Sequence, residues 1–316
     1  MQQDNAAKSV RGLGWFFLIL IAVHVSFSIA FSLLAQKGIT FPVEILLVMS
    51  ELTILVPAFI YVLIKNMSFA DDMGFRPIKP ATFFMCILLS FLVTPVASLV
   101  NAISQLFVSN RMVSVSDTLA GGSSAAVLFL GAIYAPLCEE FVFRGVIARR
   151  YEKYIGPVGA MFISSLFFGL AHLNINQAAY AFVLGLIFMI INKAAGSIFA
   201  SFIVHACING GNIFLLLTLT KAYKMLGGSA SFAESAEAAR QSDMLYAVIG
   251  VMLVIAMISI AISIPCVVFI SRCEGHFEEL RDMFTVKYPK FRWVTISSVA
   301  AIAFSLFVMF GLSYFV

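Results

Sequence analysis

Charged residues are scarce in this sequence. Only 11% of its 316 residues are Asp, Glu, Lys or Arg, whereas 61% are hydrophobic, and the mean hydropathy is +1.01. A soluble domain carries about 25% charged residues, so this composition excludes an ordinary soluble protein. Apolar runs of about 20 residues recur along the chain and are long enough to cross a bilayer as helices. We therefore predict an all-α fold, a polytopic transmembrane helix bundle of about eight to nine spans.

Several common site motifs are also missing. The five cysteines include no CxxC pair, and Cys86, Cys138, Cys207 and Cys266 lie in apolar runs, so we predict no structural disulfide. No HExxH is present, which excludes the helix-borne zinc site of soluble zinc proteases. The formal charge of +4 comes from residues in short loops, so we expect no nucleic-acid partner.

Nine hydrophobic segments follow one another along the chain. They run over 14–34, 42–64, 82–108, 124–148, 157–173, 176–192, 196–218, 245–270 and 293–315. The first is too long for the apolar region of a signal peptide, so we interpret it as a retained span. Among the connecting segments, Ser231 to Arg240 is rich in Ala and Glu and could form a short surface helix.

The distribution of basic residues predicts the orientation. With a cytoplasmic N-terminus and nine crossings, 14 Lys and Arg residues fall in inside segments and five in outside segments. Cytoplasmic loops are enriched in Lys and Arg. We therefore expect a multi-pass protein of the plasma membrane with the N-terminus in the cytoplasm and the C-terminus outside the cell.

Three charged residues interrupt the fourth apolar segment. Glu139, Glu140 and Arg144 lie in its interior, and a charge at mid-bilayer costs about 2.5–3.5 kcal/mol on insertion scales. Such residues usually face the protein interior and mark a functional site. Glu140 and Arg144 are four residues apart and can pair on one helix face.

Two other spans offer residues that complement these carboxylates. His172 follows Phe168 by four residues in the fifth segment, and Asn209 follows His205 by four in the seventh. Each pair therefore shares one helix face. If the three faces converge, they form a buried polar site. Small residues next to these positions would allow close helix approach; they are Gly145, Gly169 and Gly210.

Two chemistries fit this set of residues. In one, Glu139, His172 and His205 bind Zn²⁺ and leave one position for water. In the other, which requires no cofactor, Glu139 acts with His172 as general base on a water, and His205 and Asn209 stabilise the oxyanion. Glu140 and Arg144 support the site in either scheme. An amide is a poor zinc ligand, so Asn209 favours the second.

The three motifs together resemble those of the CPBP family, the CAAX proteases and bacteriocin-processing peptidases that are also called Abi. Its EExxxR motif is matched by Glu139, Glu140 and Arg144, its FxxxH by Phe168 and His172, and its HxxxN by His205 and Asn209. The resemblance implies an intramembrane endopeptidase with catalytic helices in 120–217, flanked by helices in 1–119 and a loop with further helices in 218–316.

The same resemblance implies the activity and the partners. The substrate would be a membrane-associated peptide or lipidated protein, and the role would be peptide maturation or bacteriocin self-immunity. The short loops look bacterial, which argues against a prenylated substrate. Water must reach the site through a polar cavity, and the position of Glu139 relative to Arg149 favours an opening to the cytoplasmic side.

Two alternatives remain open from the sequence. The polar residues could form only an interhelical hydrogen-bond network, as in a scaffold or a regulatory partner. A transporter would show inverted repeats and symmetric broken helices, and no symmetric pair is visible here. Glu51 in the second segment is either a packing residue or part of a proton path or substrate groove, and His24 in the first is expected to be structural.

Overall fold

The computed structural model describes residues 2–228, 231–286 and 294–311, and these residues contain helices and no strand. The helices are α1 (Gln2–Gln36), α2 (Val43–Ile64), α3 (Pro80–Ser104), α4 (Arg111–Ser114), α5 (Ser116–Gly121), α6 (Ser124–Phe129), η1 (Leu130–Tyr134), α7 (Ala135–Glu140), η2 (Phe141–Ala148), α8 (Arg149–Ala171), α9 (Ile175–Ala195), α10 (Ile198–Met225), α11 (Phe232–Arg240), α12 (Met244–Glu274), α13 (Phe277–Thr285) and α14 (Ile296–Gly311). The all-α prediction is confirmed.

Seven helical runs in the described residues are long and apolar enough to cross a membrane, fewer than the eight to nine expected. The difference has two sources. The fourth and fifth predicted segments lie together in the run 124–171, whose backbone leaves the helical conformation at Gly156. The ninth is represented by α14, whose 16 residues are shorter than a typical span, and part of the predicted segment falls outside the described residues.

The run from 124 to 171 nevertheless folds back on itself. Gly156 has φ 76° and ψ 169°, a conformation that favours glycine, and Pro157 follows it. The Ser164 hydroxyl donates a hydrogen bond of 2.8 Å to the carbonyl of Phe143, so the parts on either side of Gly156 lie against each other. The two segments predicted from the sequence are therefore two antiparallel helices joined by a tight turn.

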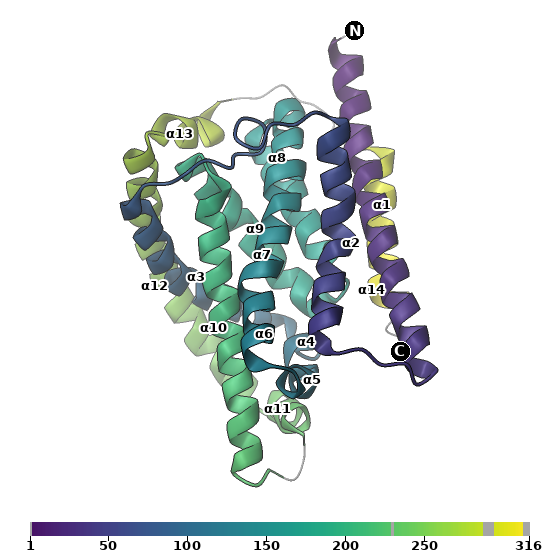
Figure 1. Cartoon of the computed structure of the whole chain (residues 1–316). Coiled ribbons are helices and arrows are strands. Elements are labelled where there is room, and N and C mark those ends of the chain that lie inside the picture. The colour runs from purple at the N-terminus through teal and green to yellow at the C-terminus, as the bar shows by residue number, and fades with distance from the viewer. Residues whose placement is uncertain (1, 229–230, 287–293, 312–316) are drawn as a thin grey trace.

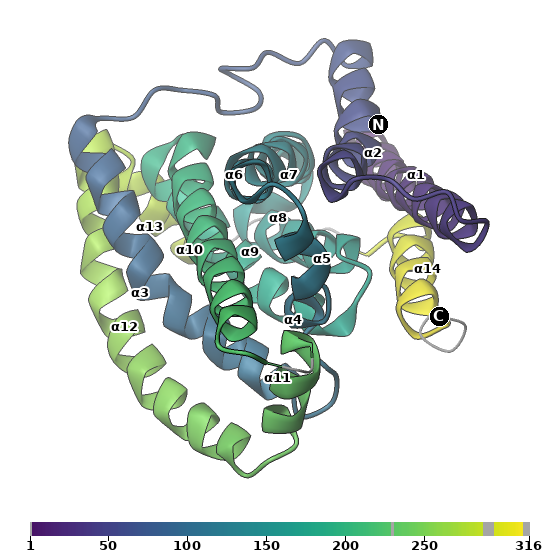
Figure 2. The same cartoon turned by 60° about the horizontal axis from the view of Figure 1, so that its bottom comes forward.

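The bundle has a central group of helices flanked on two sides. The centre consists of α7, η2, α8, α9 and α10; α1, α2 and α14 lie on one side, and α3 and α12 on the other (Figures 1 and 2). Their contacts agree with this order, because α2 packs on α7, α1 on α8, and α3 on both α9 and α10. The side chains with the least exposure are concentrated in the central helices.

The loops gather at two opposite faces. At the first, which we call the basic face, the segments 65–79, 149–156, 193–197 and 272–285 meet, with Lys153 2.5 Å from Asp72 and Lys193 2.5 Å from Glu152. At the opposite face, 105–123 meets 172–177 and 219–243 through the Arg111 amide and Asn176, 3.1 Å apart. The charge distribution assigned these two groups to opposite sides, and the contacts agree; Lys287, Lys290 and Arg292 lie outside the described residues.

One prediction for the connecting segments is confirmed. The short surface helix expected over 231–240 is α11, and Ser231 starts it with a capping box in which the Ser231 hydroxyl accepts from the Glu234 amide at 3.1 Å. Arg240 ends the helix and donates a 2.7 Å hydrogen bond to the carbonyl of Gln105. These contacts hold α11 across the opposite face of the bundle (Figure 2).

Candidate active site

The two adjacent glutamates lie where the helix changes its winding. Glu139 and Glu140 end α7, and the π-helical segment η2 begins at the next residue. A π-helical turn shifts the side chains that follow it, and such turns are frequent at functional sites. The predicted ion pair between Glu140 and Arg144 still forms across this segment. The Arg144 Nε lies 3.4 Å from the Glu140 Oε2, and both side chains are fully buried. The sequence reasoning had no signal for the π-helix.

Glu140 is held from three directions. Besides Arg144, it accepts a 2.6 Å hydrogen bond from the Ser201 hydroxyl, and its Oε1 lies 3.1 Å from the Nδ1 of His205. The Arg144 guanidinium lies over the ring of Phe168 at 4.3 Å and that of Phe188 at 5.2 Å. A buried ion pair needs such additional contacts to offset its desolvation. The carboxylate of Glu140 is therefore held by contacts with other buried side chains.

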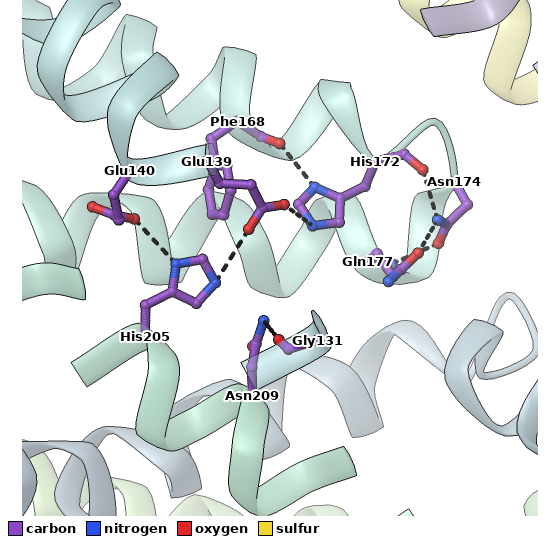
Figure 3. Close-up of polar contacts among 9 residues, drawn as sticks. All are labelled: Gly131, Glu139, Glu140, Phe168, His172, Asn174, Gln177, His205 and Asn209. Carbon is purple, nitrogen blue, oxygen red and sulfur yellow. Dashed lines mark hydrogen bonds and ion pairs between the residues drawn. The ribbon is translucent and has the colours of Figure 1, made fainter. Parts of the chain in front are cut away.

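Glu139 points away from that cluster, into the space between two imidazoles (Figure 3). Its Oε2 lies 3.4 Å from the Nε2 of His205, and its Oε1 lies 3.8 Å from the Nε2 of His172. The Glu139 side chain retains 14% exposure, whereas that of Glu140 has none. The convergence of the three spans that the sequence suggested is thus present in the structure.

The second nitrogen of each imidazole is already occupied. The Nδ1 of His172 donates to the carbonyl of Phe168 at 2.9 Å, and the Nδ1 of His205 faces the carboxylate of Glu140. A carbonyl or carboxylate partner assigns the hydrogen to Nδ1 and leaves Nε2 available. Both histidines therefore present Nε2 toward Glu139, where a proton can be shared or a water bound.

Asn209 lies one helical turn beyond His205 on α10. Its Nδ2 is 3.5 Å from the carbonyl of Gly131, at the limit of a hydrogen bond, so the amide is weakly engaged. Both Asn209 and His205 line one cavity of the protein, as do Phe168 and His172. The amide can therefore donate to a group that enters this cavity.

The cavity has a volume of about 290 Å³ and leads away from the basic face. From His205 it follows α10 as far as Leu219 and ends beside Met112 of α4 and Phe232 of α11. Those elements belong to the opposite face. The position of Glu139 relative to Arg149 predicted an opening on the side of Arg149, whereas the cavity leads toward the opposite face, near which α8 ends beside His172. Which face lies in the cytoplasm stays a prediction.

Close helix approach near the site is confirmed. A Cβ on Gly169 would lie 2.8 Å from the carbonyl oxygen of Ala178 in α9, a distance that real Cβ atoms essentially never show. Substituents on Gly145 and Gly210 would also be tight, 3.0 Å from Met73 and 3.1 Å from Ala132. Small residues let these helices approach closely enough for His172 and His205 to reach Glu139.

The zinc scheme needs three converging ligands. In the described residues no group of three or more His, Cys, Asp or Glu side chains is placed to hold a metal ion. Glu139, His172 and His205 face one another, but as arranged they do not form a coordination site.

Several residues of the site were not anticipated. Ser201 lies four residues before His205 on the same helix face, a spacing that could have revealed it. Phe188 stacks near His205 with ring centroids 4.8 Å apart, and no sequence pattern distinguishes it from an ordinary core residue. Glu51, by contrast, has a buried Oε2 without a hydrogen-bond partner in the described part of the chain, on a helix that packs against α7.

Part of the chain matches a known protein family. Residues 121–211, which contain all three motifs, match the model of the type II CAAX prenyl endopeptidase Rce1-like family. Neither the curated proteins nor the solved structures gave a match to this chain. The matched segment begins at the end of α5 and ends in α10, so it contains both glutamates, both histidines and Asn209. This segment is therefore similar to the CAAX-protease-like endopeptidases, and the similarity covers less than a third of the chain.

Proposed function

We propose that this protein hydrolyses a peptide bond of a membrane-associated protein or peptide with a water activated by Glu139. One observation carries the proposal: the Glu139 carboxylate lies between the Nε2 atoms of two histidines, and both histidines line a cavity. A carboxylate there can accept a proton from water, and groups around it can stabilise the charge that develops on a carbonyl oxygen.

The reaction follows from the position of each side chain. A water between Glu139 and His172 loses a proton to Glu139 as it attacks the scissile carbonyl. The amide of Asn209 donates a hydrogen bond to the oxyanion, and His205 does the same when its ring carries a second proton on Nε2 in addition to the one on Nδ1. The Glu140 carboxylate at Nδ1 stabilises that imidazolium, as the carboxylate does in serine-protease triads. Glu139 then returns the proton to the leaving amine, so that water is added across the bond.

Arg144 and Phe168 act as positioning residues in this scheme. Arg144 maintains the negative charge of Glu140, and the carbonyl of Phe168 fixes the orientation of His172. Neither reaches the reacting atoms. Their removal would therefore disturb the catalytic groups through Glu140 and His172.

The biological setting is part of the proposal. We place the protein in the plasma membrane with the basic face in the cytoplasm, because Lys and Arg are enriched on cytoplasmic loops. Its substrate would be a membrane-associated peptide or a lipidated protein, and its role the maturation of peptides or self-immunity to bacteriocins. A zinc-dependent form, with Glu139, His172 and His205 as ligands, stays a prediction. Metal analysis of the purified protein tests it: one zinc per chain that is lost in His205→Ala would support the zinc enzyme.

Substitution of the two reacting groups tests the hydrolase. In liposomes, with a quenched peptide attached to a single-span anchor, Glu139→Gln and His172→Ala should each lower kcat/KM about 10²- to 10⁴-fold. Glu278→Gln is the matched control, because Glu278 is an exposed carboxylate on α13. Full cleavage by both site variants at normal abundance would contradict the hydrolase function and favour a scaffold role.

A further inference from the structure

The chemistry of the cavity wall restricts what can enter. No Asp, Glu, Lys or Arg lines the cavity in the described residues, and its polar groups other than the histidines are mainly carboxamides. They are Asn101, Asn110, Gln177, Asn209 and Asn212. A carboxamide both donates and accepts, as a peptide bond does. Between them lie aliphatic side chains such as Leu184 and Ile208.

A second hollow continues from the cavity to the surface. We call it the α11 groove: it has a volume of about 590 Å³ and lies between α11 and residues 105–114. It shares Asn110 and Val113 with the cavity wall, so the two spaces adjoin at these residues. Polar side chains line it, among them Ser109 and Glu237. Arg240 bonds α11 to Gln105 across one end.

The α11 groove also determines the side from which the site is reached. It lies at the opposite face, where the connecting segments carry only a few of the cations, whereas the basic face carries most of them. Since cytoplasmic loops are enriched in Lys and Arg, the groove would open outside the cytoplasm.

We infer that the site takes an uncharged, extended peptide segment presented from the extracytoplasmic side, with the adjoining chain in the α11 groove. The inference rests on the proposed hydrolase function and adds the class and the route of its substrate. In the cavity, carboxamides bond the peptide backbone and aliphatic side chains accept apolar substituents. No Lys or Arg of the described cavity wall would pair with a carboxylate on the buried segment, and an unpaired charge is costly in such a space.

The first experiment tests the side of the opening without any substrate. Ser109→Cys places a thiol in the groove, and Lys65→Cys places one on the basic face; both positions are exposed. In intact cells a membrane-impermeant maleimide should label Ser109→Cys, and should label Lys65→Cys only after permeabilisation. Background from the natural cysteines is measured on the unsubstituted chain. The reverse pattern would overturn the extracytoplasmic route while leaving the hydrolase untouched.

The second experiment tests the groove itself. A bulky maleimide on Ser109→Cys should lower kcat/KM for an uncharged quenched peptide at least tenfold relative to the same unlabelled variant. Thr118→Cys, exposed on α5 of the same face but outside the groove lining, should be unaffected by its label. Unchanged cleavage by labelled Ser109→Cys would overturn the groove as the route.

The charge requirement is tested with the same peptide. Replacing a residue next to the scissile bond by Asp should reduce cleavage at least tenfold, and equal cleavage would overturn the uncharged class. Cleavage of a prenylated peptide alone would replace the inferred substrate by a lipidated one. If the unlabelled protein and Glu139→Gln release product at the same rate, the proposed function itself fails, a result distinct from those above.

Discussion

The imidazole of His205 joins the two adjacent glutamates of this site. Its Nδ1 lies 3.1 Å from the Glu140 Oε1, and its Nε2 lies 3.4 Å from the Glu139 Oε2. Glu140 is fully buried and bonded to Ser201, whereas Glu139 retains contact with open space. The two adjacent glutamates thus have different environments. Glu140 orients the imidazole of His205, whereas Glu139 can exchange a proton with a water.

We expect Glu140→Gln to lose both activity and stability. The variant removes the charge that pairs with Arg144 and orients His205. Breaking a buried ion pair by neutralising one partner costs about 3–5 kcal/mol. Thermal unfolding in detergent and the cleavage rate measure the two losses. The double variant Glu140→Gln with Arg144→Gln should recover part of the stability and none of the activity; recovery of both would contradict this role.

Substitutions of Asn209 and Asn212 should affect different kinetic constants. Asn209→Ala removes an oxyanion donor, so kcat should fall about 10²- to 10³-fold with little change in KM. Asn212 lines the same cavity farther along α10, so Asn212→Ala should raise KM and leave kcat nearly unchanged. Steady-state kinetics on one quenched peptide measure both. An equal rise of KM in the two variants would show that Asn209 only binds substrate.

A methyl group at Gly169 should disturb the packing of α8 on α9. Its Cβ would meet the backbone oxygen of Ala178 at 2.8 Å, and backbone atoms cannot yield as a flexible side chain can. We expect Gly169→Ala to lower the free energy of unfolding by about 1–3 kcal/mol. Gly211→Ala is the matched control, since nothing lies within 4 Å of its Cβ. Equal melting temperatures for the two variants would contradict the close approach.

The ion pair between Asp72 and Lys153 should make a small contribution that depends on pH. The hydrogen bond from Lys153 is the main cause that lowers the pKa of Asp72 below its ordinary 3.8. Its stabilisation is therefore complete above pH 3.8 and is lost as the pH falls through the lower folded pKa. Both side chains are partly exposed, which limits the effect to below about 1 kcal/mol.

Melting curves between pH 6 and pH 2 measure this contribution. Asp72→Asn and Lys153→Gln should each reduce the acid-dependent loss of stability, and the double variant should show no further reduction. An unchanged pH profile in Asp72→Asn would mean that the pair contributes nothing in solution.

The polar residues of the site could be predicted because a membrane protein places few charges in its spans. Glu139, Glu140 and Arg144 stood out against an apolar run, and the spacing of His172 and His205 from their motif partners completed the set. Ser201 and Phe188 did not stand out, because serine and phenylalanine occur throughout such spans. The tight turn at Gly156 separates the fourth and fifth predicted segments without a loop, so a list of long apolar helical runs joins them into one.

The sequence by itself determined that the chain is a helical membrane bundle with one buried polar cluster, since composition and the cost of charge in lipid require both. The tertiary structure alone decided how the cluster is oriented and where its cavity leads. Those features depend on how α8, α9 and α10 pack around Glu139 and on the contact of α11 with Gln105. Both arise from contacts between segments far apart in the chain, and hydropathy and spacing along one helix carry no information about such contacts.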